Sequence, residues 1–197
     1  MNIIGEFPEI LFRAFDRRDY AQQFLDGNIR FGAVLGYQEI EDKGRRDKTE
    51  GIGHYTTKGV ATKIQVCSNV FYALCCHRDL KSALEIGHGK YIVEIENPLQ
   101  LAKDIAKSLS STPYKHFPWL EGVNIEYDKG EEKEKPKPPE NIKLTYSQKL
   151  RSYSPENEFR FVFCCENSIE KNIAVLLKDK IKGNIYKHEQ HDNKECM

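Results

Sequence analysis

Two glutamates near the C-terminal end, Glu156 and Glu158, have the type and spacing to act on one ligand. They form a Glu-x-Glu pair just before residues 159–165, whose aromatic and β-branched content predicts a buried strand. In an extended chain such a pair points to one face, with a separation of about 6–7 Å. Because Pro155 favours a strand start, we expect both carboxylates where the strand opens onto solvent or a cleft. The alternative is a charged strand end, with Glu158 paired to Arg160 or solvated.

Arg13 is the first candidate for ligand binding in the N-terminal part of the chain. It interrupts the hydrophobic segment ILFRAF, residues 10–15, which predicts a short strand. A buried guanidinium needs hydrogen-bond partners, so Arg13 either reaches water from an edge strand or lines a polar cleft. In a cleft, its planar fork of donors suits a carboxylate or a pyrophosphate.

Gly32 and Tyr37 follow in the next predicted strand and loop. Residues 28–35, NIRFGAVL, alternate as a strand, and Gly32 lets a backbone or a ligand approach closely. Tyr37 begins the polar stretch 36–58, and a loop of this length is usually functional or disordered. The loop therefore either covers a ligand or is solvated.

Composition excludes several classes of protein. With 197 residues the chain fits one domain, 1–197, and its 30 basic and 30 acidic residues give no overall field that selects nucleic acid. No apolar run approaches the roughly 18–20 residues of a membrane span, and the start lacks a signal peptide, so we expect a cytoplasmic protein with no membrane partner. Four of the six cysteines form adjacent pairs at 75–76 and 164–165, which indicates buried thiols, and no spacing predicts a metal site.

Hydrophobic periodicity predicts the elements that must position these residues. Helices are expected over 16–27, 80–86 and 99–109, and strands over 10–15, 28–35, 60–66, 70–76, 90–96, 121–127, 159–165, 173–177 and 183–186. The almost entirely apolar strand 70–76 is expected to be central. Residues 128–140 have nearly no apolar content and predict a mobile insertion, and residues 187–197 predict a frayed tail.

In this order, the features resemble the ADP-ribosyltransferase superfamily, especially its short bacterial toxin-like members from toxin–antitoxin and anti-phage systems. The resemblance is carried by Arg13 in ILFRAF, by IRFG at 29–32 leading to Tyr37, and by Glu158 in ENEFRFVF. It implies an α+β fold with a split, mostly antiparallel sheet flanked by short helices. It also implies an NAD-binding cleft between the two halves of that sheet, with NAD as co-substrate.

The resemblance further implies a role for each candidate residue. Arg13 would hold the phosphates or ribose of NAD, and Tyr37 would stack on the nicotinamide. Glu158 would be the catalytic carboxylate that bonds the ribose 2′-hydroxyl, and Glu156 would activate the acceptor. Gly32 belongs to the cofactor-binding set, although many relatives carry Ser or Thr there, so one support for the ribose is missing. No metal is required, because the leaving nicotinamide is neutral.

The expected function is NAD-dependent transfer of ADP-ribose to a protein or a nucleic acid, by an intracellular toxin or anti-phage effector that an antitoxin can hold in check. One alternative is a catalytically silent binding module with this fold, in which Glu156 and Glu158 neutralise Arg13 or Arg151. Another is a nuclease that uses the two glutamates and Asp47 with a divalent metal.

Overall fold

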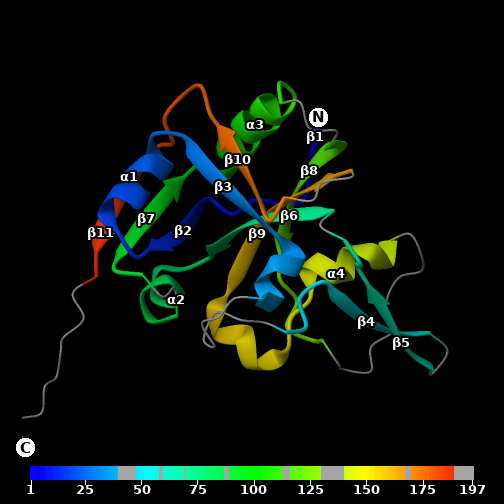
Figure 1. The fold of residues 1–197 in the computed structure, drawn as a ribbon. Coiled ribbons are helices and arrows are strands. Elements are labelled where there is room, and N and C mark those ends of the chain that lie inside the picture. The colour runs from blue at the N-terminus through cyan, green and yellow to red at the C-terminus, as the bar shows by residue number, and fades with distance from the viewer. Residues whose placement is uncertain are drawn as a thin grey trace, which may run out of the picture.

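The computed structural model describes residues 1–39, 48–57, 60–68, 70–86, 89–112, 116–129, 140–166 and 170–188 (Figure 1). The strands are β1 Asn2–Ile4, β2 Ile10–Phe15, β3 Asn28–Ala33, β4 Ile52–Thr57, β5 Val60–Gln65, β6 Phe71–His77, β7 Tyr91–Glu96, β8 His116–Asn124, β9 Glu158–Cys165, β10 Asn172–Leu176 and β11 Gly183–Lys187. The helices are α1 Arg18–Leu25, α2 Leu80–Glu85, α3 Pro98–Leu109 and α4 Leu144–Ser147, with short 3₁₀ helices η1 Val34–Glu39, η2 Glu140–Lys143 and η3 Arg151–Glu156.

Nine of the strands form one sheet in the order β1-β8-β9-β6-β2-β7-β11, with β3 and β10 attached to β6. Its strand pairs are antiparallel, apart from the parallel pair β1–β8. This confirms the prediction of an α+β fold with a mostly antiparallel sheet and short helices.

The sheet branches at β6. Along one edge, β6 pairs with β9 over its whole length. Along the other edge it pairs with β3 at Tyr72 and Ala73 and with β2 only at His77. Two branches, β3-β10 and β2-β7-β11, therefore leave β6 at different points. The stretch of β6 between them, Leu74–Cys76, lies where they part.

Alternation along β9 assigns the two faces of the sheet. Phe159, Phe161, Phe163 and Cys165 belong to one core, while Val162 and Cys164 belong to a second core. The first core includes the buried stripe of α3, Leu101, Ala102, Ile105, Ala106 and Leu109, together with Phe24 and Leu25 of α1. The adjacent cysteines divide between the same two faces, as expected for packed thiols.

The second face is covered by α4, whose Tyr146 belongs to the second core. Helix α4 in turn contacts the hairpin β4–β5, which projects from the main sheet (Figure 1). Gln148 attaches this hairpin. Its side-chain oxygen accepts from the His54 backbone N–H at 2.8 Å, and its amide nitrogen donates to the His54 carbonyl at 3.2 Å. The same nitrogen donates to Asp128 at 2.9 Å. One amide side chain thus pairs with the edge of β4 as a strand would.

Helix α1 differs from its prediction at the N-terminal end. It starts at Arg18 instead of residue 16, and the N-cap residue Arg17 makes no side-chain cap bond. Its buried residues are Ala21, Phe24 and Leu25. Gly27 follows the helix with φ +93°, the left-handed conformation expected at a glycine stop.

Three predictions for the polar segments need correction. The stretch 36–58 contains η1 and β4, and β5 pairs with β4 instead of joining the main sheet. Asp128 and Lys129 are buried, so 128–140 is not mobile at its start, and residues 130–139 lie outside the described part of the chain. The tail starts later than expected, because Lys187 belongs to β11, and residues 189–197 also lie outside. None of the described helices is long and apolar enough to cross a membrane.

Candidate functional site

A cavity of about 360 Å³ lies where the two branches leave β6. We call it the fork cavity. It brings together Arg13, Gly32 and Tyr37, the three residues assigned to cofactor binding from the sequence. Its lining residues come from β2, β3, η1 and the start of β10: Arg13, Arg30, Gly32, Ala33, Gly36, Tyr37, Lys171 and Asn172.

Arg30 and Lys171, which line the fork cavity, were missed by the sequence analysis. Both are exposed. Arg30 is an outward position on β3, and Lys171 directly precedes β10. The only signal was a basic residue on the polar side of an alternating strand, which is common on solvated strands. Together with Arg13 they make the lining cationic, which favours an anionic ligand.

Arg13, on β2, reaches across to β6. Its Nη1 donates to the backbone carbonyl of Cys75, in the stretch of β6 where the branches part. The guanidinium carbon lies 5.5 Å from the ring centroid of Phe15 and 5.8 Å from that of Phe24. Its Nε is buried and has no hydrogen-bond partner among the described residues. A buried unpaired donor is costly, so Arg13 is equipped to bond an acceptor on a ligand.

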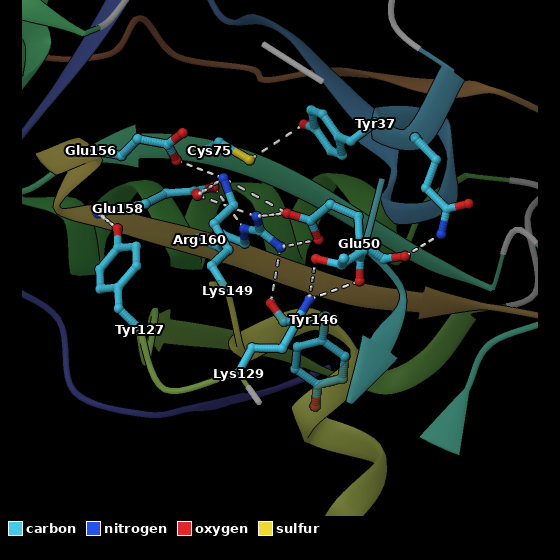
Figure 2. A network of polar contacts seen from close by, with 12 residues as sticks. Tyr37, Glu50, Cys75, Tyr127, Lys129, Tyr146, Lys149, Glu156, Glu158 and Arg160 are labelled. Atoms are coloured by element: carbon cyan, nitrogen blue, oxygen red, sulfur yellow. Dashed lines mark hydrogen bonds and ion pairs between the residues drawn. The ribbon is translucent and has the colours of Figure 1, made fainter. Parts of the chain in front are cut away.

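Gly32 and Tyr37 are in direct steric contact. A methyl group placed on Gly32 would lie 3.3 Å from the hydroxyl oxygen of Tyr37. This hydroxyl also lies 3.3 Å from Sγ of Cys75, and Figure 2 shows the two side chains pointing toward each other. Burial, followed by the nearby Cys75, raises the pKa of Tyr37 well above its ordinary value. The phenol therefore stays protonated and can act as a donor.

Glu158 is buried instead of facing solvent or a cleft, which corrects the expectation for this residue. Its side chain is 5% exposed. Arg160 donates to it twice, from Nε at 2.6 Å and from Nη2 at 3.2 Å, and Lys149 Nζ lies 2.8 Å away. Burial alone would raise the pKa of Glu158, but the charges of Arg160 and Lys149 outweigh it and hold the pKa well below its ordinary value. Glu158 is therefore ionised.

Glu156 does not share a strand with Glu158. It ends η3, and Asn157 between the two glutamates is left-handed at φ 40°, so the extended spacing assumed from the sequence is wrong. The two carboxylates nevertheless converge, because Lys149 Nζ lies 2.5 Å from Glu156 as well. Burial and the charge of Glu158 raise the pKa of Glu156 to about 7 against the lowering effect of Lys149.

Glu50 completes this network, and the sequence analysis missed its role (Figure 2). Arg160 Nη1 donates to Glu50 at 3.0 Å, and Nη2 donates to its other oxygen. Both side chains are 1% exposed, and Lys149 lies 3.7 Å from Glu50. Three carboxylates thus surround two cations. Their charges balance when Glu156 is protonated, and one negative charge is in excess when Glu156 is ionised. An arginine inside an apolar strand was a signal for Arg160, as it was for Arg13, but nothing local marked Glu50.

Cys75 lies between the fork cavity and this buried charge network. Its carbonyl accepts from Arg13, and its thiol contacts the Tyr37 hydroxyl. Burial and the nearby charge of Glu158 raise the pKa of this thiol. Glu156 and Glu158 are not among the residues that line the cavity. The structure therefore groups Arg13, Gly32 and Tyr37 on one side of Cys75 and the glutamates on the other.

Two further expectations concern the partners of the glutamates. The silent-module hypothesis expected Arg13 or Arg151 to neutralise them. Both glutamates pair with Lys149, Glu158 also pairs with Arg160, and Arg13 donates to the Cys75 carbonyl. Within the described ranges, no three His, Cys, Asp or Glu side chains are placed to hold a metal ion. Asp47, the third residue of the nuclease hypothesis, lies outside those ranges.

Comparison of the chain with protein-family models, with curated proteins and with solved structures found no match.

Proposed function

We propose that this protein is an NAD-dependent ADP-ribosyltransferase that binds NAD in the fork cavity. One observation carries the proposal: Arg13 from β2 lines a single cavity, where the sheet branches, together with Gly32 of β3 and Tyr37 of η1. The volume of about 360 Å³ is within the range of ligand pockets, about 300–1,000 Å³. Arg30 and Lys171 add positive charge, and guanidinium donors suit a pyrophosphate.

In this proposal Glu158 stabilises the reacting sugar. The bond between nicotinamide and ribose breaks with its electron pair going to the neutral nicotinamide, which leaves positive charge on the sugar, as in glycoside cleavage. An ionised carboxylate lowers the energy of that state, and Glu158 is held ionised by Arg160 and Lys149. Lys149 contacts Oε2 of Glu158, so this ammonium must shift before the ribose can reach the same oxygen.

Glu156 is suited to the second half of the reaction. The acceptor forms the new bond to the sugar and gives up a proton, which a base must take. A base works best with a pKa near the working pH, and Glu156 has a pKa of about 7. It is also more accessible than Glu158, with a side chain 18% exposed. The acceptor is a protein or a nucleic acid, and the toxin or anti-phage role with an antitoxin partner belongs to this proposal through the resemblance alone.

A silent nucleotide-binding module is the second candidate. It is favoured by the pairing of both Glu158 oxygens inside a buried network, an arrangement that also suits a purely structural carboxylate. In that case the fork cavity binds a nucleotide, and the glutamates stabilise the fold.

The test combines NAD binding with NAD turnover. Purified protein is incubated with NAD labelled in its adenylate part and with a cell extract, and nicotinamide release and label in the protein and nucleic-acid fractions are measured. We expect transfer that is lost in Glu158→Gln and Glu156→Gln and weakened in Lys171→Ala. Lys178→Ala is the matched control, because Lys178 is exposed and is not among the cavity-lining residues.

The outcomes separate the two candidates. Binding that needs Lys171 but gives no nicotinamide release would support the silent module. Absence of binding by the wild-type protein would contradict both. Thermal unfolding of each variant shows whether lost activity reflects lost folding, and Glu156→Gln serves as the second catalytic test if Glu158→Gln does not fold.

A further inference from the structure

We propose that Tyr37 acts through its hydroxyl, as a hydrogen-bond donor to the ligand, with Cys75 as the residue that positions it and Gly32 as the residue that makes room for it. This inference rests on the proposed function, because it assigns a contact to the ligand of the fork cavity. It differs from the expectation that the Tyr37 ring stacks on the ligand, and the two roles can be separated by experiment.

Gly32 leaves room beside β3 for the Tyr37 hydroxyl. Glycine in a strand interior weakens the strand, so its presence in β3 needs a local reason. Backbone conformation is not that reason, since Gly32 is not among the glycines with positive φ. The three atoms nearest to an added methyl group all belong to Tyr37, and its hydroxyl oxygen is the closest at 3.3 Å. The Tyr37 hydroxyl therefore occupies the space that a side chain at position 32 would fill.

The hydrogen bond between Cys75 and Tyr37 leaves the phenolic proton free for a ligand. The thiol of Cys75 donates to the Tyr37 oxygen at 3.3 Å, which leaves the phenolic proton for an acceptor in the cavity. Burial and the nearby charge of Glu158 raise the pKa of the Cys75 thiol, so Cys75 keeps the proton that it donates to Tyr37.

Tyr37 lies between the fork cavity and the buried charge network. It is the only phenol among the described residues that line the fork cavity. Its ring centroid lies 6.0 Å from the guanidinium carbon of Arg160, so the buried charge network lies beside the ring. Arg13 and Lys171 supply positive charge to the cavity. Tyr37 supplies a neutral hydrogen-bond donor, whose bond a sugar hydroxyl or a phosphate oxygen can accept.

The experiment measures NAD affinity by calorimetry for the wild type, Tyr37→Phe, Tyr37→Leu, Gly32→Ser and the double variant Gly32→Ser with Tyr37→Phe. Loss of one hydrogen bond of about 1 kcal/mol corresponds to roughly a five- to tenfold weaker Kd. We expect Tyr37→Phe to lose this amount and Tyr37→Leu to lose about the same. The serine hydroxyl of the double variant enters the space vacated by the phenol oxygen, so we expect it to recover most of the affinity. Gly32→Ser alone crowds Tyr37 and weakens binding.

Cys75 is tested with a matched pair of variants. Cys75→Ser keeps a donor to Tyr37 and is expected to bind NAD nearly as well as the wild type. Cys75→Ala removes the donor and is expected to weaken binding, with no further loss when it is combined with Tyr37→Phe. A purely structural role for Cys75 would instead give additive losses, and that result would overturn its positioning role.

Two other results have distinct meanings. Wild-type affinity in Tyr37→Phe with a loss in Tyr37→Leu would overturn the inference in favour of stacking and would leave the proposed function intact. No NAD binding by the wild type would overturn the proposed function and the inference together, and the wild-type measurement alone reveals it. Circular dichroism and the thermal midpoint of each variant identify losses that come from misfolding.

Discussion

Arg160 Nε lies 2.6 Å from Oε1 of Glu158, two residues earlier on the same strand, and both side chains are buried. Because alternate residues of a strand share a face, the strand itself brings this cation and this anion together. The Nη1 and Nη2 atoms of the same guanidinium donate to Glu50. Arg160 thereby joins Glu158 to a segment far away in the chain.

Replacing Arg160 should destabilise the fold strongly. Arg160→Leu leaves Glu158 and Glu50 as buried carboxylates with one cation fewer, and breaking a buried pair from one side costs about 3–5 kcal/mol. The free energy of unfolding in urea at neutral pH measures the loss. Arg17→Ala is the control, since the pair Arg17–Asp19 is exposed and its removal should leave the urea midpoint unchanged. A loss under about 1 kcal/mol in Arg160→Leu would show that the network relaxes or admits water.

Glu156 should make stability fall as pH rises toward neutrality. Its pKa is raised from 4.5 to about 7, chiefly by burial. Between these two values the folded state holds a proton that the unfolded state has released, so the stabilising contribution is full below 4.5 and is lost as pH rises through about 7. Glu158 has the opposite sign, because its pKa is lowered, and its contribution is lost only at acid pH.

The measurement for Glu156 is urea unfolding of the wild type and Glu156→Gln from about pH 5 to pH 8. The wild type should lose stability relative to the variant across this window, because glutamine cannot titrate. Equal slopes for the two proteins would mean that Lys149 keeps Glu156 ionised in the folded state throughout.

Gln148 should decide whether the β4–β5 hairpin stays attached. Gln148→Leu removes three hydrogen bonds, two to the His54 backbone and one to Asp128. Buried polar groups left unpaired cost about 1–3 kcal/mol, and faster hydrogen exchange at the His54 amide should accompany the loss. Gln22→Ala, on the exposed side of α1, is the control. Unchanged exchange at His54 would mean that packing of α4 alone holds the hairpin.

Cys67 should be the first of the described cysteines to react with an alkylating reagent in the native protein. It is exposed, whereas Cys76, Cys164 and Cys165 are buried and Cys75 is half-buried. Burial raises the pKa of the Cys76 thiol to about 11 and that of Cys164 to about 12, which keeps the unreactive thiol form. Peptide mapping after brief iodoacetamide treatment at neutral pH tests this, with a denatured sample as the control. Early labelling of Cys76 or Cys164 would show that the sheet opens locally.

Much of the fold was predictable because it depends on short-range patterns. Alternation located β3, β7 and β9, and the amphipathic period located α3, all close to their observed bounds. The apolar content of β6 correctly placed it at the centre of the sheet. By contrast, β4 was missed within a polar stretch, because its order comes from pairing with β5 and from contacts with Gln148.

The residues of the candidate site were also predictable only in part. Arg13, Arg160 and the Glu-x-Glu pair are conspicuous in the sequence, because charge inside an apolar segment requires a partner or a function. Their partners are not conspicuous. Glu50 lies 110 positions from Arg160 in the chain, and no local pattern links the two.

The sequence by itself determined the secondary structure of the core, the buried thiols and the residues whose types suit them to binding or catalysis. Side-chain periodicity and the cost of burying charge act locally, which is why these features can be predicted from short stretches. Only the tertiary structure decided that Arg13, Gly32 and Tyr37 share one cavity while Glu156 and Glu158 face Lys149. The cavity exists because β2 and β3 leave β6 at different points, and the buried charges are tolerable only because cations from other segments meet them. Both conditions depend on pairing between distant parts of the chain, which no short stretch of sequence specifies.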